Sequence, residues 1–412
     1  MRYQFELLTA FAPILALALC SACGDDKSAS GGSGGTGSHL GSGGQTSSGG
    51  LPNQADASGT INVQIGGEDL ATDGIHFPNG SEVTIADGWE ITFEHVLVTV
   101  ANVTFSSNPD RSPSDQSQTG AVVAQVTGPW AADLHKQGSV VAAGGEGTAI
   151  PLFNLANQNK NGNKRFDPSE RYAFSYDIVP ATNAATKTNF NDDDTAKAAY
   201  QEMIEKGYSV FYVGTATFKG NDCQSTDAAY DYGLIPTTIP FKIGFATPAS
   251  MINCQNQENE GDAFEGEEFQ RGVAIYTNRA SVAQITLHLD HPFYSDVQHE
   301  PALHFDQFAA QLVGKGQNQP VLTIEHVVGL DPTAFTDGLG AALPWRVCDE
   351  SQLPATSQMA FDVGSVPFDP SASPSQALRD YRDYTYYVQS TQGHLNGGEG
   401  LCFVKRNYPA PQ

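Results

Sequence analysis

Basic side chains are scarce in this 412-residue chain: 21 lysines and arginines stand against 46 aspartates and glutamates, and the formal net charge is −25. Binding to nucleic acid depends on cationic groups that displace the counterions around phosphates. This charge balance therefore excludes a nucleic-acid partner. A strongly negative surface instead attracts cations, and it also serves the simpler purpose of keeping a domain in solution.

Cysteine and methionine are also rare, with six and four copies. The four cysteines beyond residue 23 are Cys223, Cys254, Cys348 and Cys402, and no two of them form a CxxC pair. This spacing argues against a thiolate metal site or a redox motif. An even number of cysteines in an exported chain predicts two disulfides. Three connectivities exist, and closure of the shortest loops favours Cys223–Cys254 with Cys348–Cys402.

Long apolar runs are missing apart from Leu7–Leu19, which follows Arg2 and is too short to span a bilayer. This arrangement predicts an export signal. The stretch resembles a bacterial lipoprotein signal, because the small residue Ala22 precedes Cys23. The resemblance implies cleavage before Cys23, a lipid such as palmitate on that cysteine and, with Gly24 next, an outer-membrane lipoprotein facing the periplasm or the exterior. The alternative is a secreted protein without lipid.

The chain therefore divides into a signal peptide over residues 1–22, a lipid anchor and flexible tether over 23–59, and a domain over 60–412. From Ser28 to Gly59 the sequence is mostly Gly, Ser and Thr, with too little apolar surface to repay ordering. The domain is long enough for one large core. The alternative is two subdomains that meet near residues 182–207.

Alternation of apolar and polar residues predicts a mainly β fold, a β-sandwich-like two-sheet domain with two or three short helices. The expected strands lie at 89–94, 172–178, 210–218, 239–245, 273–289 and 321–328. A helix is expected from the acidic cap 192–194 to Gly207. Two more are expected from Pro301 to about Gly314 and from Ser375 to about Tyr384.

Four of the ten histidines fall between residues 288 and 304, and they alternate with carboxylates. Imidazole and carboxylate together are ligands that zinc favours, with copper or iron as alternatives. On an extended strand His288 and Asp290 share one face. The predicted metal ligands are His288, Asp290, His291, His299 and His304.

Two catalytic motifs can be compared with this segment. His299 and Glu300 resemble the start of the helical metalloprotease motif, but three residues separate Glu300 from His304, which turns the second histidine away. Residues 286–291 resemble the HxHxDH motif of metallo-β-lactamase-type hydrolases, with Thr286 in place of the first histidine. That resemblance implies ligand roles for the histidines at 288 and 291, and a base or second-metal role for the aspartate between them.

A second ion site is indicated between residues 159 and 170, where the sequence resembles an EF-hand-type calcium loop. The oxygen-bearing side chains at its ligand positions are Asn159, Asn161, Asn163, Asp167 and Glu170. Three asparagines replace aspartates, and Lys164 stands at the turn-glycine position. A weakly held structural calcium and a polar turn that binds nothing are the two alternatives.

Three functions fit these observations. The first is a surface-tethered lipoprotein that binds a divalent transition metal and exchanges it with a metal-transport partner in the cell envelope. The second is an exported zinc-dependent hydrolase, with His288, His291 and a later histidine as ligands and Asp290 or Glu300 as base. The third is a noncatalytic adhesion or scaffold domain. No complete catalytic motif is present and no GxSxG elbow supports a serine hydrolase, which favours metal carriage over catalysis.

Overall fold

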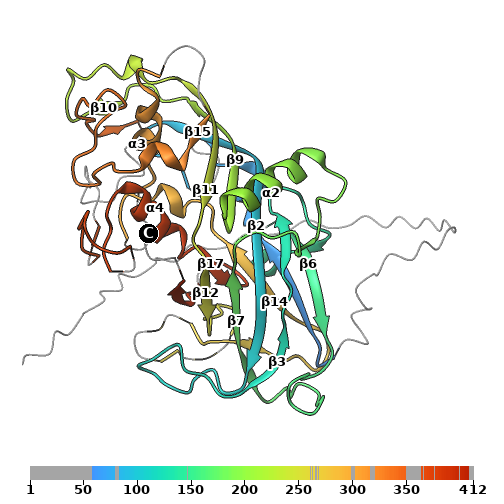
Figure 1. Ribbon diagram of the computed structural model, residues 1–412. Coiled ribbons are helices and arrows are strands. Elements are labelled where there is room, and N and C mark those ends of the chain that lie inside the picture. Colours follow the sequence, from blue (N-terminus) through green and yellow to red (C-terminus); the bar gives the residue numbers. More distant parts are fainter. Residues whose placement is uncertain are drawn as a thin grey trace, which may run out of the picture. The chain divides into compact units, whose positions relative to one another are not determined.

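The longest strand, β2 (Trp89–Ser106), runs through the middle of the larger of two main sheets. Its first half shows the predicted alternation, with Trp89, Ile91 and Phe93 buried. The strand pairs in antiparallel fashion with β9 (Val210–Phe218) along its first half and with β7 (Arg171–Ile178) along its second half (Figure 1). Both partners match predicted strands, so the period-two patterns located the centre of this sheet.

The computed structural model describes residues 58–78, 83–145, 147–259, 261, 263–264, 267, 269–297, 302–315, 321–348, 363–364, 366–374, 376–398 and 400–407. All of them belong to one compact unit, Pro52–Gln412. The predicted signal peptide, Cys23 and nearly all of the tether lie outside the described residues, as do His299 and Glu300. Within the described ranges, no helix combines the length and apolar character needed to cross a bilayer.

The larger sheet has 11 strands, and its main path runs β15-β11-β9-β2-β7-β12-β18. Besides β2, β7 and β9, its strands are β3 (Val122–Val126), β4 (Trp130–Asp133), β8 (Thr186–Lys187), β11 (Thr238–Phe245), β12 (Ala249–Ile252), β13 (Val273–Ala274), β15 (Leu322–Thr323) and β18 (Phe403–Arg406). A separate two-stranded sheet joins β10 (Gln224–Ser225) to β16 (Arg346–Val347).

The second main sheet has five strands in the order β17-β14-β1-β6-β5. They are β1 (Ile61–Gly66), β5 (Val140–Val141), β6 (Thr148–Leu155), β14 (Ser281–Leu287) and β17 (Gly393–Leu395). Strand β14 runs parallel to β1 and antiparallel to β17, whose residues come more than a hundred positions later in the chain. This pairing joins the histidine-rich segment to the C-terminal region.

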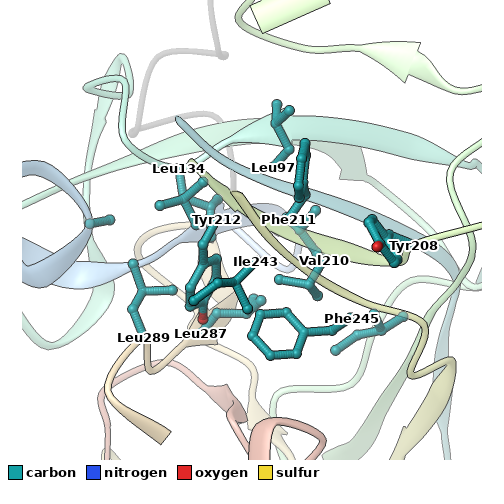
Figure 2. Packing of buried hydrophobic residues seen from close by; sticks show 14 of the residues in the cluster. Leu97, Leu134, Tyr208, Val210, Phe211, Tyr212, Ile243, Phe245, Leu287 and Leu289 are labelled. Atoms are coloured by element: carbon teal, nitrogen blue, oxygen red, sulfur yellow. The ribbon is translucent and has the colours of Figure 1, made fainter. Parts of the chain in front are cut away.

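The two main sheets share one core. Figure 2 shows Tyr212 of β9 and Ile243 of β11 beside Leu287 and Leu289 from the end of β14. A polar contact crosses the same interface, because the Tyr212 hydroxyl donates to Gln392 Oε1 at 2.8 Å. The domain is therefore mainly β and sandwich-like, with a few helices, as predicted.

Four α-helices are described: α1 (Glu68–Asp73), α2 (Asp194–Lys206), α3 (Asp306–Ala309) and α4 (Tyr381–Gln389). Short 3-10 turns are η2 (Ala143–Gly145), η3 (Tyr232–Leu234), η4 (His291–Phe293), η5 (Ala310–Leu312) and η6 (Ile324–Val327). Helix α2 confirms its prediction, because the Asp193 carboxylate accepts from two N–H groups of the first turn and Gly207 ends the helix in the left-handed conformation.

Several predicted elements differ from the structure. The strand expected over 273–289 is divided, because β13 ends at Ala274 and β14 begins only at Ser281. The helix expected from Pro301 begins only at Asp306, because the distant Asp87 carboxylate caps the N–H groups of Phe305 and Asp306. The last helix starts at Tyr381, where the Asp380 side chain caps it. The strand expected over 321–328 is only two residues long, since a capping box from Thr323 turns the chain into η6.

Candidate metal centre

The strand that leads to the first site histidine is β14, and both of its faces are buried. Its apolar face joins the core, and its other face bears Gln284 and Thr286. Gln284 accepts a hydrogen bond from Gln64 Nε2 at 2.8 Å and donates to Thr286 Oγ1 at 2.9 Å. This face of β14 is therefore polar, and hydrogen bonds hold its side chains in place. The strand ends at Leu287, so His288 and Asp290 lie beyond it and do not share a strand face as predicted.

Three imidazoles meet just beyond the end of β14. His288 follows the strand, His291 opens the turn η4, and His394 lies in β17 opposite Thr286. One ligand atom from each histidine lies within 4.8 Å of those of the other two. The rings of His288 and His394 are stacked at 4.3 Å, while that of His291 stands edge-on to both.

This spacing suits a metal ion after a small contraction. A tetrahedral zinc with Zn–N bonds of about 2.1 Å separates its nitrogens by about 3.4 Å. The rings would therefore move by roughly 1 Å, a distance within reach of small side-chain rotations. The three ligands come from a strand end, a turn and a second strand, so the fold itself brings them together.

Hydrogen bonds fix the tautomer of two of these rings. The Thr391 hydroxyl donates its proton to the Val388 carbonyl at 2.7 Å, so it accepts from His291 Nδ1 at 2.8 Å. The Gly400 carbonyl likewise accepts from His394 Nδ1 at 3.2 Å. When Nδ1 carries the proton of a neutral imidazole, the lone pair is on Nε2. Both rings are therefore in the form that ligates a metal through Nε2, with the supporting contacts typical of metal-bound histidines.

Two carboxylates lie beside the histidines. Glu68 Oε2 is 3.3 Å from His288 Nε2, and Glu68 adopts a left-handed backbone with φ of 57°. Asp290 is buried, and its Oδ1 atom has no hydrogen-bond partner among the described residues. Burial raises the pKa of Asp290, and the nearby charge of His288 opposes that rise. A cation at this position would compensate both acidic groups.

The structure brings together only part of the predicted ligand set. His288 and His291 belong to the group, with Asp290 next to them in the chain. His304 does not belong to it: its Nδ1 atom lies 3.5 Å from Asp87, and its ring is 4.6 Å from that of Trp345. The bridges that Leu303 makes to Ile85 and Tyr294 direct the chain to that location.

The third member of the group, His394, was missed from the sequence. It is an isolated histidine in the short segment Gly393–Leu395, far along the chain from the cluster. Its role depends on the pairing of β17 with β14, a long-range contact without a local signal. Only the glycines around it, Gly393, Gly397 and Gly398, hint at a constrained backbone.

The predicted calcium loop joins β6 to β7, so no helices flank it as in an EF-hand. Asn159 makes two hydrogen bonds with the backbone of Gln125, through Oδ1 at 2.9 Å and Nδ2 at 2.8 Å. Asn161 donates to Gln158. Asp167 accepts from the backbone and hydroxyl of Ser169, and these bonds lower its pKa. These side chains already have structural partners, and calcium binding stays a prediction.

Two disulfides are present, but the predicted pairing is wrong. The bonds join Cys223 to Cys348 and Cys254 to Cys402. Strand pairing explains this connectivity, because β10 next to β16 places the first two cysteines together and β12 next to β18 places the second two together. Loop length governs the entropy of closure in the unfolded chain, whereas the folded partners are set by the sheets.

Comparisons of the chain with models of protein families, with curated proteins and with solved structures found no match. The arguments about function therefore depend on the chemistry of the residues described above.

Proposed function

We propose that this protein binds one divalent transition-metal ion, zinc first among the candidates, through His288, His291 and His394. The observation that carries the proposal is the convergence of three imidazoles, two of them held with Nε2 as the ligand atom. All-nitrogen ligation by neutral histidines suits zinc and copper(II) better than calcium or magnesium. Together with the expected export signal, this supports metal carriage or handover in the cell envelope.

The surrounding charge supports the same proposal. Glu68 and Asp290 place two carboxylates near the three rings, in an environment where an uncompensated anion is costly. A divalent ion balances two carboxylates and needs no further counter-charge. The whole chain carries a charge of −25, which raises the local concentration of cations around the molecule.

Carriage fits the site better than catalysis. Hollows of about 470 Å³ and about 320 Å³ exist in the domain, but none of the three histidines lines either one. The His288 side chain is 20% exposed, and the other two residues are buried. Zinc hydrolases need an open position that faces a substrate cleft. Hydrolysis remains the second candidate because three histidine ligands leave a fourth position beside the Glu68 carboxylate.

The first test is to export the full chain to a bacterial periplasm, purify it with its disulfides intact and measure bound metals by mass spectrometry. We expect close to one zinc, copper or iron ion per chain, lost in His288→Ala/His291→Ala and in His394→Ala. His76→Ala is the matched control, since this half-exposed histidine lies outside the group. If no metal binds even after titration with zinc and copper, the proposal is wrong and a scaffold role remains.

A further inference from the structure

The hairpin that supplies His394 is fastened at both of its ends. On one side, β17 pairs with β14 and sets His394 opposite Thr286. On the other side, the chain returns past the same histidine, so that Leu401 forms a β-bridge with it and the Gly400 carbonyl accepts from its Nδ1. The next residue is Cys402, which is bonded to Cys254. The ring is thus oriented by a segment whose end is a disulfide.

Cys254 is itself firmly attached to the larger sheet. It is fully buried, its N–H donates to the Phe174 carbonyl at 3.1 Å, and its carbonyl accepts from the N–H of Gly272 at 2.9 Å. The next residue, Gln255, donates to the Leu401 carbonyl at 2.9 Å. The disulfide therefore joins the returning arm of the hairpin to a rigid part of the fold.

The same hairpin also limits the position of His288. A Cβ atom at Gly398 would lie only 2.6 Å from His288 Nε2 and 3.3 Å from Glu68 Oε1. At Gly400 a Cβ atom would lie 2.4 Å from the Gln255 carbonyl oxygen. The hairpin backbone therefore lies directly against the centre at Gly398 and against the segment that carries Cys254 at Gly400, where the contact is with backbone and requires glycine.

We propose that the metal centre is complete only when the Cys254–Cys402 disulfide is formed, so that reduction of this bond weakens metal binding. The inference rests on the proposed function. Thiol–disulfide exchange with an external dithiol breaks the S–S bond, gives two cysteine thiols and leaves the dithiol as a disulfide. The freed arm then no longer holds the Gly400 carbonyl against His394 Nδ1. Loss of such a supporting contact weakens metal affinity by about 10- to 100-fold.

The chain provides its own control in the other disulfide. Cys223 and Cys348 lie beside Gly88 and Gly220, and no described contact joins either cysteine to the histidine group. We would measure zinc affinity by competition with a chelating dye for the wild type, Cys254→Ser/Cys402→Ser and Cys223→Ser/Cys348→Ser. The first variant should bind at least about 10-fold more weakly, and the second should stay within about twofold of the wild type.

Equal zinc affinity in all three proteins would overturn the inference and leave the proposed function intact. If the oxidised wild type binds no zinc, the proposed function itself is overturned. If the first variant does not fold, stepwise reduction of the wild type decides. Cys223 and Cys348 are half-buried and Cys254 and Cys402 are buried, so a phosphine reductant should open the first pair earlier. Zinc release should coincide with alkylation of Cys254 and Cys402; release with the first pair would contradict the inference.

Discussion

The Nδ1 atom of His291 lies 2.8 Å from the hydroxyl oxygen of Thr391, which follows the end of helix α4. Thr391 gives its own proton to the Val388 carbonyl, and the same carbonyl lies 3.3 Å from His291 Nδ1, so both contacts favour a proton on Nδ1. A residue at a helix end thus sets the protonation of a ring in a different segment of the chain. The state of the proposed centre therefore depends on α4 as well as on the strands that carry its ligands.

Replacement of this hydroxyl should weaken metal binding without loss of the fold. Thr391→Val keeps the shape of the side chain and removes the closer acceptor of His291 Nδ1, which leaves only the Val388 carbonyl at 3.3 Å. We expect zinc affinity to fall about 10-fold, as for other contacts that orient a ligand histidine. Competition with a chelating dye measures this. Thr385→Val is the matched control, because its hydroxyl bonds the Tyr381 carbonyl within α4 and touches no site histidine; an equal loss there would refute the orienting role.

Glu68 should contribute to binding and carry a conformational cost. Its carboxylate lies 3.3 Å from His288 Nε2, and its φ of 57° is unfavourable for any residue with a Cβ atom. Glu68→Gln should lower zinc affinity by about 10- to 100-fold because it removes the charge beside the ligand. Glu68→Gly should lower affinity in the same way, but without a lower melting temperature in the metal-free protein, since glycine adopts this backbone readily.

The exposed neighbour Asp69 gives the control for the two Glu68 variants. Asp69→Asn removes one negative charge from the same short helix, at a side chain that makes no described contact with the histidines. Its affinity should stay within about twofold of the wild type at 0.15 M salt, where exposed charges are largely screened. If Asp69→Asn matches Glu68→Gln, general electrostatic attraction explains the effect and the Glu68 contact does not.

Local signals in the sequence predicted the elements that local physics determines. The bounds of β9 match their prediction, and α2 follows from a capping aspartate and a terminal glycine that lie within the helix's own segment. Helix α3 is shorter than predicted because its cap, Asp87, comes from far away in the chain. Nothing near Pro301 could have indicated that partner.

The ligands of the proposed centre also differ in how far the sequence could predict them. The crowding of histidines pointed to His288 and His291, since both lie in one continuous segment. His394 joins them only through the register of β17 on β14. The disulfide pairing was wrong for the same reason, because Cys254 and Cys402 meet through the pairing of β12 with β18. Contacts between distant strands leave no periodic trace in either partner.

A buried histidine away from the centre should make stability depend on pH. His95 Nδ1 lies 2.8 Å from Asp133, and its Nε2 lies 3.2 Å from the Thr195 hydroxyl, whose proton goes to Asp193. Both ring nitrogens therefore donate, and the hydrogen bond to Asp133 raises the pKa of His95 above 6.5. The stabilisation is complete below the unfolded pKa of about 6.5 and is lost as pH rises through the higher folded pKa.

Urea unfolding of the metal-free protein at pH 6 and pH 9 tests this expectation. The wild type should lose stability between these values, and His95→Gln should lose less, because glutamine does not titrate. Both proteins contain the other histidines. Subtracting the pH dependence of the variant from that of the wild type therefore cancels the contribution of those histidines to the free energy of unfolding. A pH dependence identical in wild type and variant would show that His95 is not the responsible group.

The buried pair of Arg346 and Asp306 should make stability fall with rising pH as well, here through a carboxyl group. Arg346 reaches both oxygens of Asp306, at 3.0 and 2.5 Å, and Trp89 Nε1 donates to the same carboxylate at 2.8 Å. Burial raises the pKa of Asp306 to about 7, with Asp87 adding repulsion and Arg346 opposing the rise. The folded protein thus holds this proton more tightly than the unfolded chain, so stability falls as pH rises from about 4 to about 7.

Arg346→Met should therefore destabilise the protein most at high pH. Removal of one partner of a buried pair costs about 3–5 kcal/mol when the other charge stays ionised. Near pH 5 Asp306 can take up a proton in the folded variant, so the loss should be clearly smaller there. Asp306→Asn/Arg346→Met should abolish this pH difference, since no charge then needs compensation. Denaturant unfolding at pH 5 and pH 8.5 measures the stability of both variants. If Arg346→Met loses the same stability at the two pH values, packing around the guanidinium dominates and the charge of Asp306 does not.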